Sequence, residues 1–148
     1  MTSVITQTIP VLFYSDVKRA LNWLEDKYGF QITTIFEDNQ GHIAHAEMRL
    51  GEARIMVGPA NITDWAKSPA SMGGNNSQQT YIYVGDVDSH FERANEQSAQ
   101  IISQPEEQFN GDKTYQTVDL DGHRWIFAEK IRDVSKQDMA EITGLTVK

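Results

Sequence analysis

The chain has 148 residues, enough for one domain with a sizeable core, and its 39% hydrophobic and 23% charged content is ordinary for a globular protein. Its net charge of −8 at pH 7 argues against nucleic acid or anionic membranes as partners, since both would repel it, and favours a cationic ligand; the alternative is that the acidity serves only solubility. The absence of cysteine excludes disulfides, thiolate zinc sites and cysteine nucleophiles.

The N-terminal residues show no basic region followed by an apolar run, so the sequence predicts no signal peptide. Its apolar stretches are all shorter than the ~18 residues that a membrane span requires. We therefore expect a cytoplasmic protein.

The first half of the chain predicts a strand, a helix and three more strands. Ser15 or Asp16 is the expected helix cap, because a short side-chain oxygen accepts hydrogen bonds from the free N–H groups of the first turn. Gly29 is expected to end this helix, whose apolar residues form one stripe facing a sheet: Val17, Ala20, Leu21, Leu24 and Tyr28. The expected strands are Thr8–Tyr14, Gln31–Phe36, Ile43–Leu50 and Ala53–Val57.

Alternation of side chains assigns the faces of the strand Ile43–Leu50. Ala46 and Met48 face the core, whereas His45 and Glu47 share the opposite face. If that face lines a cleft, His45 and Glu47 are candidates for an acid–base pair; the alternative is a polar strip that faces solvent or a dimer partner. Of the other histidines, His123 is expected to be structural, and His42 and His90 are expected at the surface.

The second half repeats this order after a long loop. Residues Pro59–Ser77 have no sustained period and are rich in Pro, Gly and Asn, which is typical of a loop. Trp65 within the loop either contacts a ligand or packs back on the domain. Asp86 or Asp88 is the expected cap of a second helix. The remaining predicted elements are a strand at Gln78–Val84, a strand at Gln100–Gln104 broken by Pro105, and a short helix capped by Ser135 or Asp133.

Residues 111–129 predict a hairpin with a tight turn at Asp121-Gly122, because Gly adopts positive φ without steric cost. Counting from this turn puts Val118 and Leu120 on the core face with Trp125 and Phe127. The opposite face is then expected to carry Tyr115, Arg124 and Ile126, and to join Tyr81 and Tyr83 in an aromatic pocket for a small molecule or in a dimer interface.

Two sequence features each occur twice, at nearly the same spacing. Asp16 and Asp86, at the two helix starts, lie about 70 positions apart, and the turn glycines Gly51 and Gly122 lie about 71 apart. A duplicated strand–helix–strand–strand–strand unit explains both. The sequence therefore predicts a single α+β domain, residues 1–148, made of two βαβββ modules at about 7–58 and 78–130, with a joining loop at 59–77 and a C-terminal tail at 131–148.

These features resemble a known family. The duplication, the Ser-Asp-Val and Gly-Asp-Val helix starts and above all the run from Asp119 to Trp125 are similar to the vicinal oxygen chelate superfamily, which includes glyoxalase I, bleomycin-resistance proteins and extradiol dioxygenases. His45-Ala46-Glu47, Gly51 and the tail at 133–135 resemble its bacterial glyoxalase/bleomycin-resistance-like branch. The resemblance covers about residues 7–138; Trp23-Leu24 departs from it, where Phe-Tyr is common.

The resemblance implies a U-shaped mixed sheet around a cleft, and a homodimer. Metal-dependent members bind one divalent ion through a ligand on the first strand of each module and a Glu on the last. The corresponding positions here are Ile9, Met56, Gln79 and Ile126. Three are aliphatic or thioether side chains, which do not serve a hard divalent ion, and Gln79 alone is a weak ligand. We therefore expect no cofactor, and a divalent metal only if this alignment of ligand positions is wrong.

Three functional hypotheses follow. The first is a metal-free protein that binds or sequesters a cationic or aromatic small molecule in a dimer cleft. That cleft is expected to comprise Ile9, Met56, Trp65, Gln79, Tyr81, Tyr83, Tyr115, Arg124 and Ile126. The second is an enzyme of the same superfamily, a glyoxalase-like lyase or dioxygenase, or one that uses His45 and Glu47 without the usual metal. The third is an interaction module whose cleft face is simply a dimer interface.

Overall fold

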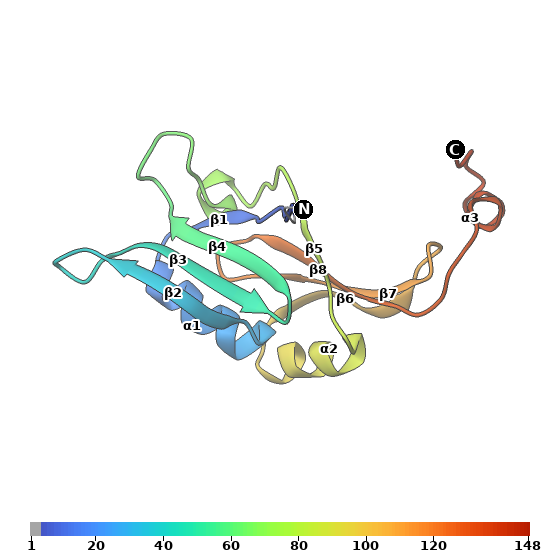
Figure 1. The fold of residues 1–148 in the computed structure, drawn as a ribbon, viewed down its shortest axis with the longest axis horizontal. Coiled ribbons are helices and arrows are strands. Elements are labelled where there is room, and N and C mark those ends of the chain that lie inside the picture. The colour runs from blue at the N-terminus through green and yellow to red at the C-terminus, as the bar shows by residue number, and fades with distance from the viewer. Residues whose placement is uncertain (1–3) are drawn as a thin grey trace.

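A computed structural model describes residues 4–148 as two four-stranded sheets with helices packed along one side (Figure 1). The duplicated α+β architecture predicted from the sequence is confirmed. The elements are β1 (Val11–Tyr14), α1 (Val17–Tyr28), β2 (Gln31–Glu37), β3 (Ile43–Leu50), β4 (Ala53–Pro59), the 3-10 turn η1 (Pro69–Met72), β5 (Thr80–Tyr83), α2 (Val87–Glu96), β6 (Gln100–Glu107), β7 (Asp112–Val118), β8 (Arg124–Lys130) and α3 (Lys136–Thr143).

The two sheets have the same topology. Their strand orders are β1-β4-β3-β2 and β5-β8-β7-β6, and in each the first strand runs parallel to the last strand of its module. The register is also shared, because Val11 lies opposite Met56 in the first sheet and Tyr81 lies opposite Ile126 in the second. Corresponding residues of the two modules therefore occupy the same place in their sheets.

The helices begin as the sequence predicts. Asp16 caps α1 by accepting a hydrogen bond from the backbone N–H of Arg19, and Asp86 caps α2 in the same way through Ser89. Gly29 ends α1 in the left-handed conformation at φ 78°. Every residue of the predicted apolar stripe of α1 is buried.

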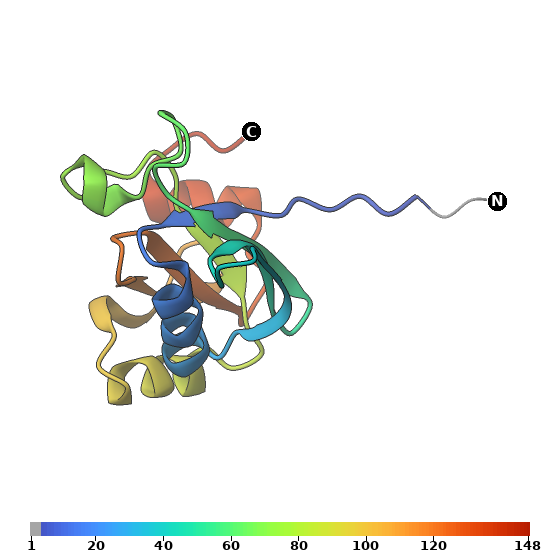
Figure 2. The same cartoon turned by 90° about the vertical axis from the view of Figure 1, so that its left-hand side faces the viewer.

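Both helices lie on the same side of the molecule (Figures 1 and 2). Between them and the sheets is one core shared by the two modules, in which Tyr28 of α1 packs edge-on against Trp125 and Phe127 of β8, with ring centroids 5.5 and 5.0 Å apart. The faces of the sheets away from the helices are called the open faces below. They carry the less buried residues of the strands, which are His45, Glu47, Arg54 and Met56 in the first module and Tyr81, Tyr83 and Ile126 in the second.

Several strand boundaries differ from the predictions. The first strand begins at Val11 and the fifth at Thr80, so both are shorter than expected. β6 does not break at Pro105 but continues to Glu107. It is an edge strand, and its pairing shifts register between Ser103 and Glu106, where the missing N–H of proline costs no ladder hydrogen bond.

The hairpin of β7 and β8 corrects the prediction for Tyr115. The last pair before the loop is Val118 with Arg124, so the loop has five residues, Asp119 to His123, and not two. Thr117 therefore lies opposite Trp125, and Tyr115 opposite Phe127. A slip of one residue moves every side chain to the other face, so Tyr115 is fully buried in the core and not in the cleft.

The C-terminal helix forms as predicted, with Ser135 as its cap. It has no buried residue and stands apart from the sheets, while residues 4–10 extend away from the body in a different direction (Figures 1 and 2). Within residues 4–148 the structure contains no helix of the length and apolarity that a membrane crossing requires.

Candidate functional site

One junction between the modules is closed by the loop from Asp119 to His123. The side chain of Asp119 holds this loop in shape, because its Oδ1 accepts from the backbone N–H groups of Asp121 and His123, each at 3.0 Å. Its Oδ2 accepts from Trp125 Nε1 at 3.0 Å and from Tyr14 Oη, in the other module, at 2.7 Å. Burial raises the pKa of Asp119, against the lowering effect of His123 and of these hydrogen bonds.

The same loop bonds to the turn between β1 and α1. The backbone N–H and the hydroxyl of Ser15 donate to Asp121 Oδ2 at 2.6 and 2.8 Å. His123 Nε2 lies 2.7 Å from the carbonyl oxygen of Phe13, and since a carbonyl only accepts, this nitrogen carries the proton. The structural role predicted for His123 is thus confirmed, although its partner belongs to the other module and not to its own turn.

The equivalent junction, between the β3–β4 turn and the start of α2, is open. It is a groove of about 1080 Å³ whose walls are residues 50–55 on one side and residues 78–86 on the other. The β3–β4 turn is short, because Leu50 already pairs with Ala53 and only Gly51 and Glu52 connect them. Ligand pockets have volumes of roughly 300–1,000 Å³, so this groove is large enough for a small organic molecule.

His90 lies at the groove and not at the surface, which corrects the sequence prediction. Its Nε2 lies 2.8 Å from the carbonyl oxygen of Tyr28, and its Nδ1 lies 2.6 Å from the hydroxyl of Tyr115. Burial lowers the pKa of His90 to about 4, because the imidazolium loses its hydration there. His90 is therefore neutral at pH 7 and joins the two modules by hydrogen bonds.

Tyr81 and Tyr83 lie on the second open face, and both line the groove. Their rings are 43% and 57% exposed and meet edge-on at 5.5 Å. Both hydroxyls donate to Oδ2 of the buried Asp112, at 2.5 and 2.8 Å. Although burial acts to raise it, these hydrogen bonds and the charge of Lys130 lower the pKa of Asp112, whose side chain is therefore a carboxylate. Asp112 was missed by the sequence reasoning, because nothing in the local pattern indicates that this residue is buried.

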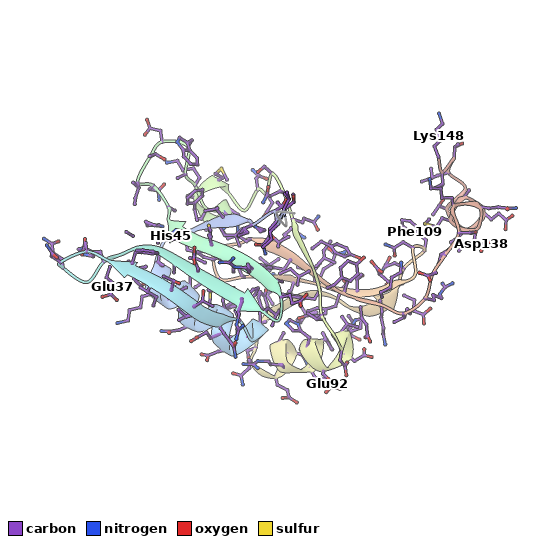
Figure 3. The ribbon with its side chains drawn as sticks, viewed as in Figure 1. Glu37, His45, Glu92, Phe109, Asp138 and Lys148 are labelled. Atoms are coloured by element: carbon purple, nitrogen blue, oxygen red, sulfur yellow. The ribbon has the colours of Figure 1, made fainter. Side chains whose placement is uncertain are left out.

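The first open face carries a polar cluster. His45, labelled in Figure 3, lies on β3 with its Nε2 at 3.7 Å from Glu47 Oε1, and Arg54 Nη2 of β4 lies 3.6 Å from Glu47 Oε2. Phe36 stacks obliquely over His45, with ring centroids 5.6 Å apart. The prediction that His45 and Glu47 share a face away from the core is confirmed, and their side chains lie near each other.

The other predicted cleft residues are spread over both modules. Met56 and Ile126 lie on the two open faces, and Ile9 and Gln79 precede the strands β1 and β5. Gln79 also lines a smaller cavity of about 440 Å³ together with Arg124. Trp65 is 74% exposed and meets the ring of Phe13 edge-on at 5.5 Å, so it packs on the domain with one edge and leaves most of its surface free.

The donor set of these positions does not fit a divalent metal. The strand register confirms that Met56 and Ile126 are equivalent residues of the two modules, and neither a thioether nor an aliphatic side chain is a ligand for a hard divalent ion. Among residues 4–148, His, Cys, Asp and Glu side chains do not gather in groups of three or more that could hold a metal ion.

Comparison with known proteins identifies the family. The profile described as Glyoxalase/Bleomycin resistance protein/Dioxygenase superfamily matches residues 5–127. The chain belongs to this superfamily. Among curated relatives it is 28% identical over 102 residues to the uncharacterized proteins Mb0911c of Mycobacterium bovis and Rv0887c of Mycobacterium tuberculosis. The match covers 67% of this chain but only 66% and 59% of those proteins, so the chain spans less than two thirds of their length.

Several solved structures share the fold. TioX from Micromonospora sp. ML1 is 28% identical, with a TM-score of 0.68, and the match covers 88% of this chain and 100% of TioX. TnmS3, an antibiotic binding protein from Streptomyces sp. CB03234, is 14% identical with a TM-score of 0.66, covering 88% and 99%. A superfamily member from Sphaerobacter thermophilus is 14% identical with a TM-score of 0.68, covering 85% and 99%.

Proposed function

We propose that this protein binds a small aromatic molecule without the help of a metal ion. The observation that carries the proposal is the groove of about 1080 Å³ beside the exposed rings of Tyr81 and Tyr83. An apolar wall with a few polar groups is the usual chemistry of a small-molecule site, and aromatic rings supply much of its contact area. TnmS3, which shares this fold, is described as an antibiotic binding protein, and the net charge of −8 favours a ligand with positive charge.

The proposed assembly is a homodimer in which a second copy covers the open faces. Large apolar side chains are exposed there or nearby: Phe36 is 54%, Tyr83 57% and Trp65 74% exposed. Exposed apolar surface of this kind is typical of an interface or a binding site. Sedimentation velocity tests the assembly: we expect a dimer for the wild-type protein and dissociation for Phe36→Glu, whereas a monomer at all concentrations would contradict it.

Calorimetric titration with two alcohols of similar size tests the binding function. 2-Phenylethanol is a neutral aromatic alcohol, and 2-cyclohexylethanol is its saturated counterpart. We expect 2-phenylethanol to bind about twofold to tenfold more tightly, and Tyr81→Ala to remove that preference, because a ring-on-ring contact is worth about 0.5–1.5 kcal/mol beyond its buried area. Ile142→Ala, which truncates an exposed side chain of α3, is the control. Equal affinities for both alcohols would refute an aromatic site.

The metal-free character has its own test. Purified protein is incubated with Mn²⁺, Ni²⁺ and Zn²⁺, and its metal content is measured after removal of the free ions. We expect far less than one ion per chain, because the donor set at Ile9, Met56, Gln79 and Ile126 is unsuited to them. One ion per chain would make a metal-dependent reaction of the superfamily the better explanation.

A second candidate function is proton transfer by His45 and Glu47. The distance of 3.7 Å between His45 Nε2 and Glu47 Oε1 on an open face favours it, since a carboxylate beside an imidazole is a suitable general acid–base pair. Turnover of a substrate that is lost in both His45→Gln and Glu47→Gln, with binding retained, would support this activity over simple sequestration.

A further inference from the structure

Asp112, at the start of β7, has an unequal distribution of hydrogen bonds on its carboxylate. Its side chain is fully buried. Oδ2 accepts three hydrogen bonds, from the hydroxyls of Tyr81 and Tyr83 and from Asn110 Nδ2 at 3.2 Å. Oδ1 accepts none from the part of the chain that the structure describes. A buried ionised oxygen that lacks a partner is destabilising, so it needs a donor.

Lys130 is the nearest cation, but it does not satisfy Oδ1. The two residues lie opposite each other across β7 and β8, and Lys130 Nζ is 4.0 Å from Oδ1, beyond hydrogen-bond distance. Its Nζ instead donates to the carbonyl oxygen of Asn110 at 3.3 Å. The side chain of Lys130 is half exposed, so it is free to move aside toward solvent.

We propose that Asp112 Oδ1 binds a cationic nitrogen, a primary ammonium or an amidinium, of an aromatic ligand whose ring lies against Tyr81 and Tyr83. The proposal rests on the function proposed above and names the chemical class of its ligand. A carboxylate only accepts, and a cationic donor forms the strongest hydrogen bond with it. A neutral hydroxyl could donate a hydrogen bond to Oδ1 but would bring no positive charge to the carboxylate.

The rings of Tyr81 and Tyr83 also suit a ligand that carries a positive charge. Because both hydroxyls are committed to Asp112, the groove meets ring surface and not free hydroxyl groups. The hydrogen-bonded carboxylate makes the rings more electron-rich, which strengthens their attraction for a cation. Lys130 then acts as an internal competitor, which the ligand's cation replaces.

Tryptamine and tryptophol test this, because they differ only in an ammonium against a hydroxyl. Calorimetric titrations use the full-length wild-type protein, Asp112→Asn and Lys130→Met at ~0.15 M salt. We expect tryptamine to bind the wild type about tenfold more tightly than tryptophol, and Asp112→Asn to abolish that difference while tryptophol changes less than about threefold. Lys130→Met should increase the affinity for tryptamine about threefold to tenfold, because it removes the competing cation.

Lys113→Met is the matched control. Lys113 follows Asp112 in the sequence and carries the same charge as Lys130, but its Nζ pairs with Asp88 at 2.8 Å and not with Asp112. This variant changes the net charge as Lys130→Met does, and should leave the preference for tryptamine within about twofold of the wild type. An equal gain in both lysine variants would mean a general charge effect and would overturn the proposal.

The remaining outcomes separate this proposal from the proposed function. If tryptophol binds but tryptamine has no advantage, the aromatic site stands and the role of Asp112 is refuted, as expected if ordered water satisfies Oδ1. If neither probe binds at millimolar concentration, both proposals fail. Should Asp112→Asn not fold, the comparison of Lys130→Met, expected to bind tryptamine more tightly, with Lys113→Met, expected to be unchanged, still decides the question.

Discussion

The two junctions between the modules are built from equivalent elements, yet one is closed and the other is open. At the closed junction a five-residue loop, Asp119 to His123, reaches the turn between β1 and α1. At the open junction the corresponding hairpin has only Gly51 and Glu52 in its turn. The partner positions differ too, because Tyr14 and Ser15 donate hydrogen bonds at the first junction, whereas the equivalent Val84 and Gly85 have no side-chain donor.

This difference shows how a duplicated fold acquires a binding site. The closed junction fixes the modules against each other through buried hydrogen bonds, and the shared core supports them from the side of the helices. At the open junction His90 links the modules by hydrogen bonds, but the short β3–β4 turn leaves a groove of about 1080 Å³. Stability is therefore expected to depend more on the first junction, and ligand binding on the second.

The largest effect is expected for Asp119→Ala at the closed junction. It leaves two backbone N–H groups, the Tyr14 hydroxyl and Trp125 Nε1 without their acceptor in a buried site. We expect a loss of about 3–5 kcal/mol in the free energy of unfolding, measured by urea denaturation.

Glu52→Ala, in the exposed turn at the open junction, is the control for this comparison. We expect it to change the free energy of unfolding by less than about 0.5 kcal/mol. If the two variants destabilise the protein equally, the division of roles between the junctions is wrong.

Local patterns were enough to predict the parts of the fold that depend on local chemistry. The apolar stripe of α1, the caps Asp16 and Asp86 and the duplication could all be read from spacing. The face of Tyr115 could not, because it depends on the number of residues in the following loop, and that number is fixed by the hydrogen bonds of Asp119. The burial of His90 and Asp112 was equally inaccessible, since it arises from contacts between distant segments.

His90, beside the groove, makes the free energy of unfolding of the protein depend on pH. The unfolded chain protonates this histidine near its usual pKa of 6.5, whereas the folded protein does so only near 4. Between these values the unfolded state binds more protons, so stability falls as the pH is lowered from about 6.5 to 4, by roughly 2–3 kcal/mol in total.

Urea denaturation at several pH values, repeated for His90→Gln, isolates this contribution. Gln retains a donor and an acceptor but does not titrate. We expect the variant to be less stable than the wild type at pH 7 but to lose less stability on acidification. Parallel pH profiles for the two proteins would show that His90 is not the group responsible.

Two Tyr→Phe changes compare phenols that donate to a buried carboxylate. Tyr14→Phe removes a fully buried hydroxyl from Asp119 Oδ2, and we expect a cost of about 1–2 kcal/mol. Tyr83→Phe removes a hydroxyl from an exposed ring, and Asp112 Oδ2 keeps the donors Tyr81 and Asn110, so less than about 0.5 kcal/mol is expected. Urea denaturation measures both costs. A larger cost for Tyr83→Phe than for Tyr14→Phe would mean that hydrogen bonds on the open side contribute more to stability.

The smallest difference between the two modules is expected at the helix starts, where the modules are alike. Asp16 and Asp86 each accept a hydrogen bond of 3.0 Å from a backbone N–H of the first helical turn, so Asp16→Ala and Asp86→Ala should each cost about 1 kcal/mol. Asp86 also accepts from the Ser89 hydroxyl at 2.9 Å, which makes its loss slightly the larger of the two. Equal costs in urea denaturation would locate the asymmetry of the molecule in its hairpin loops alone. A cost confined to Asp16→Ala would instead mean that α2, on the open side, is held by the core and not by its cap.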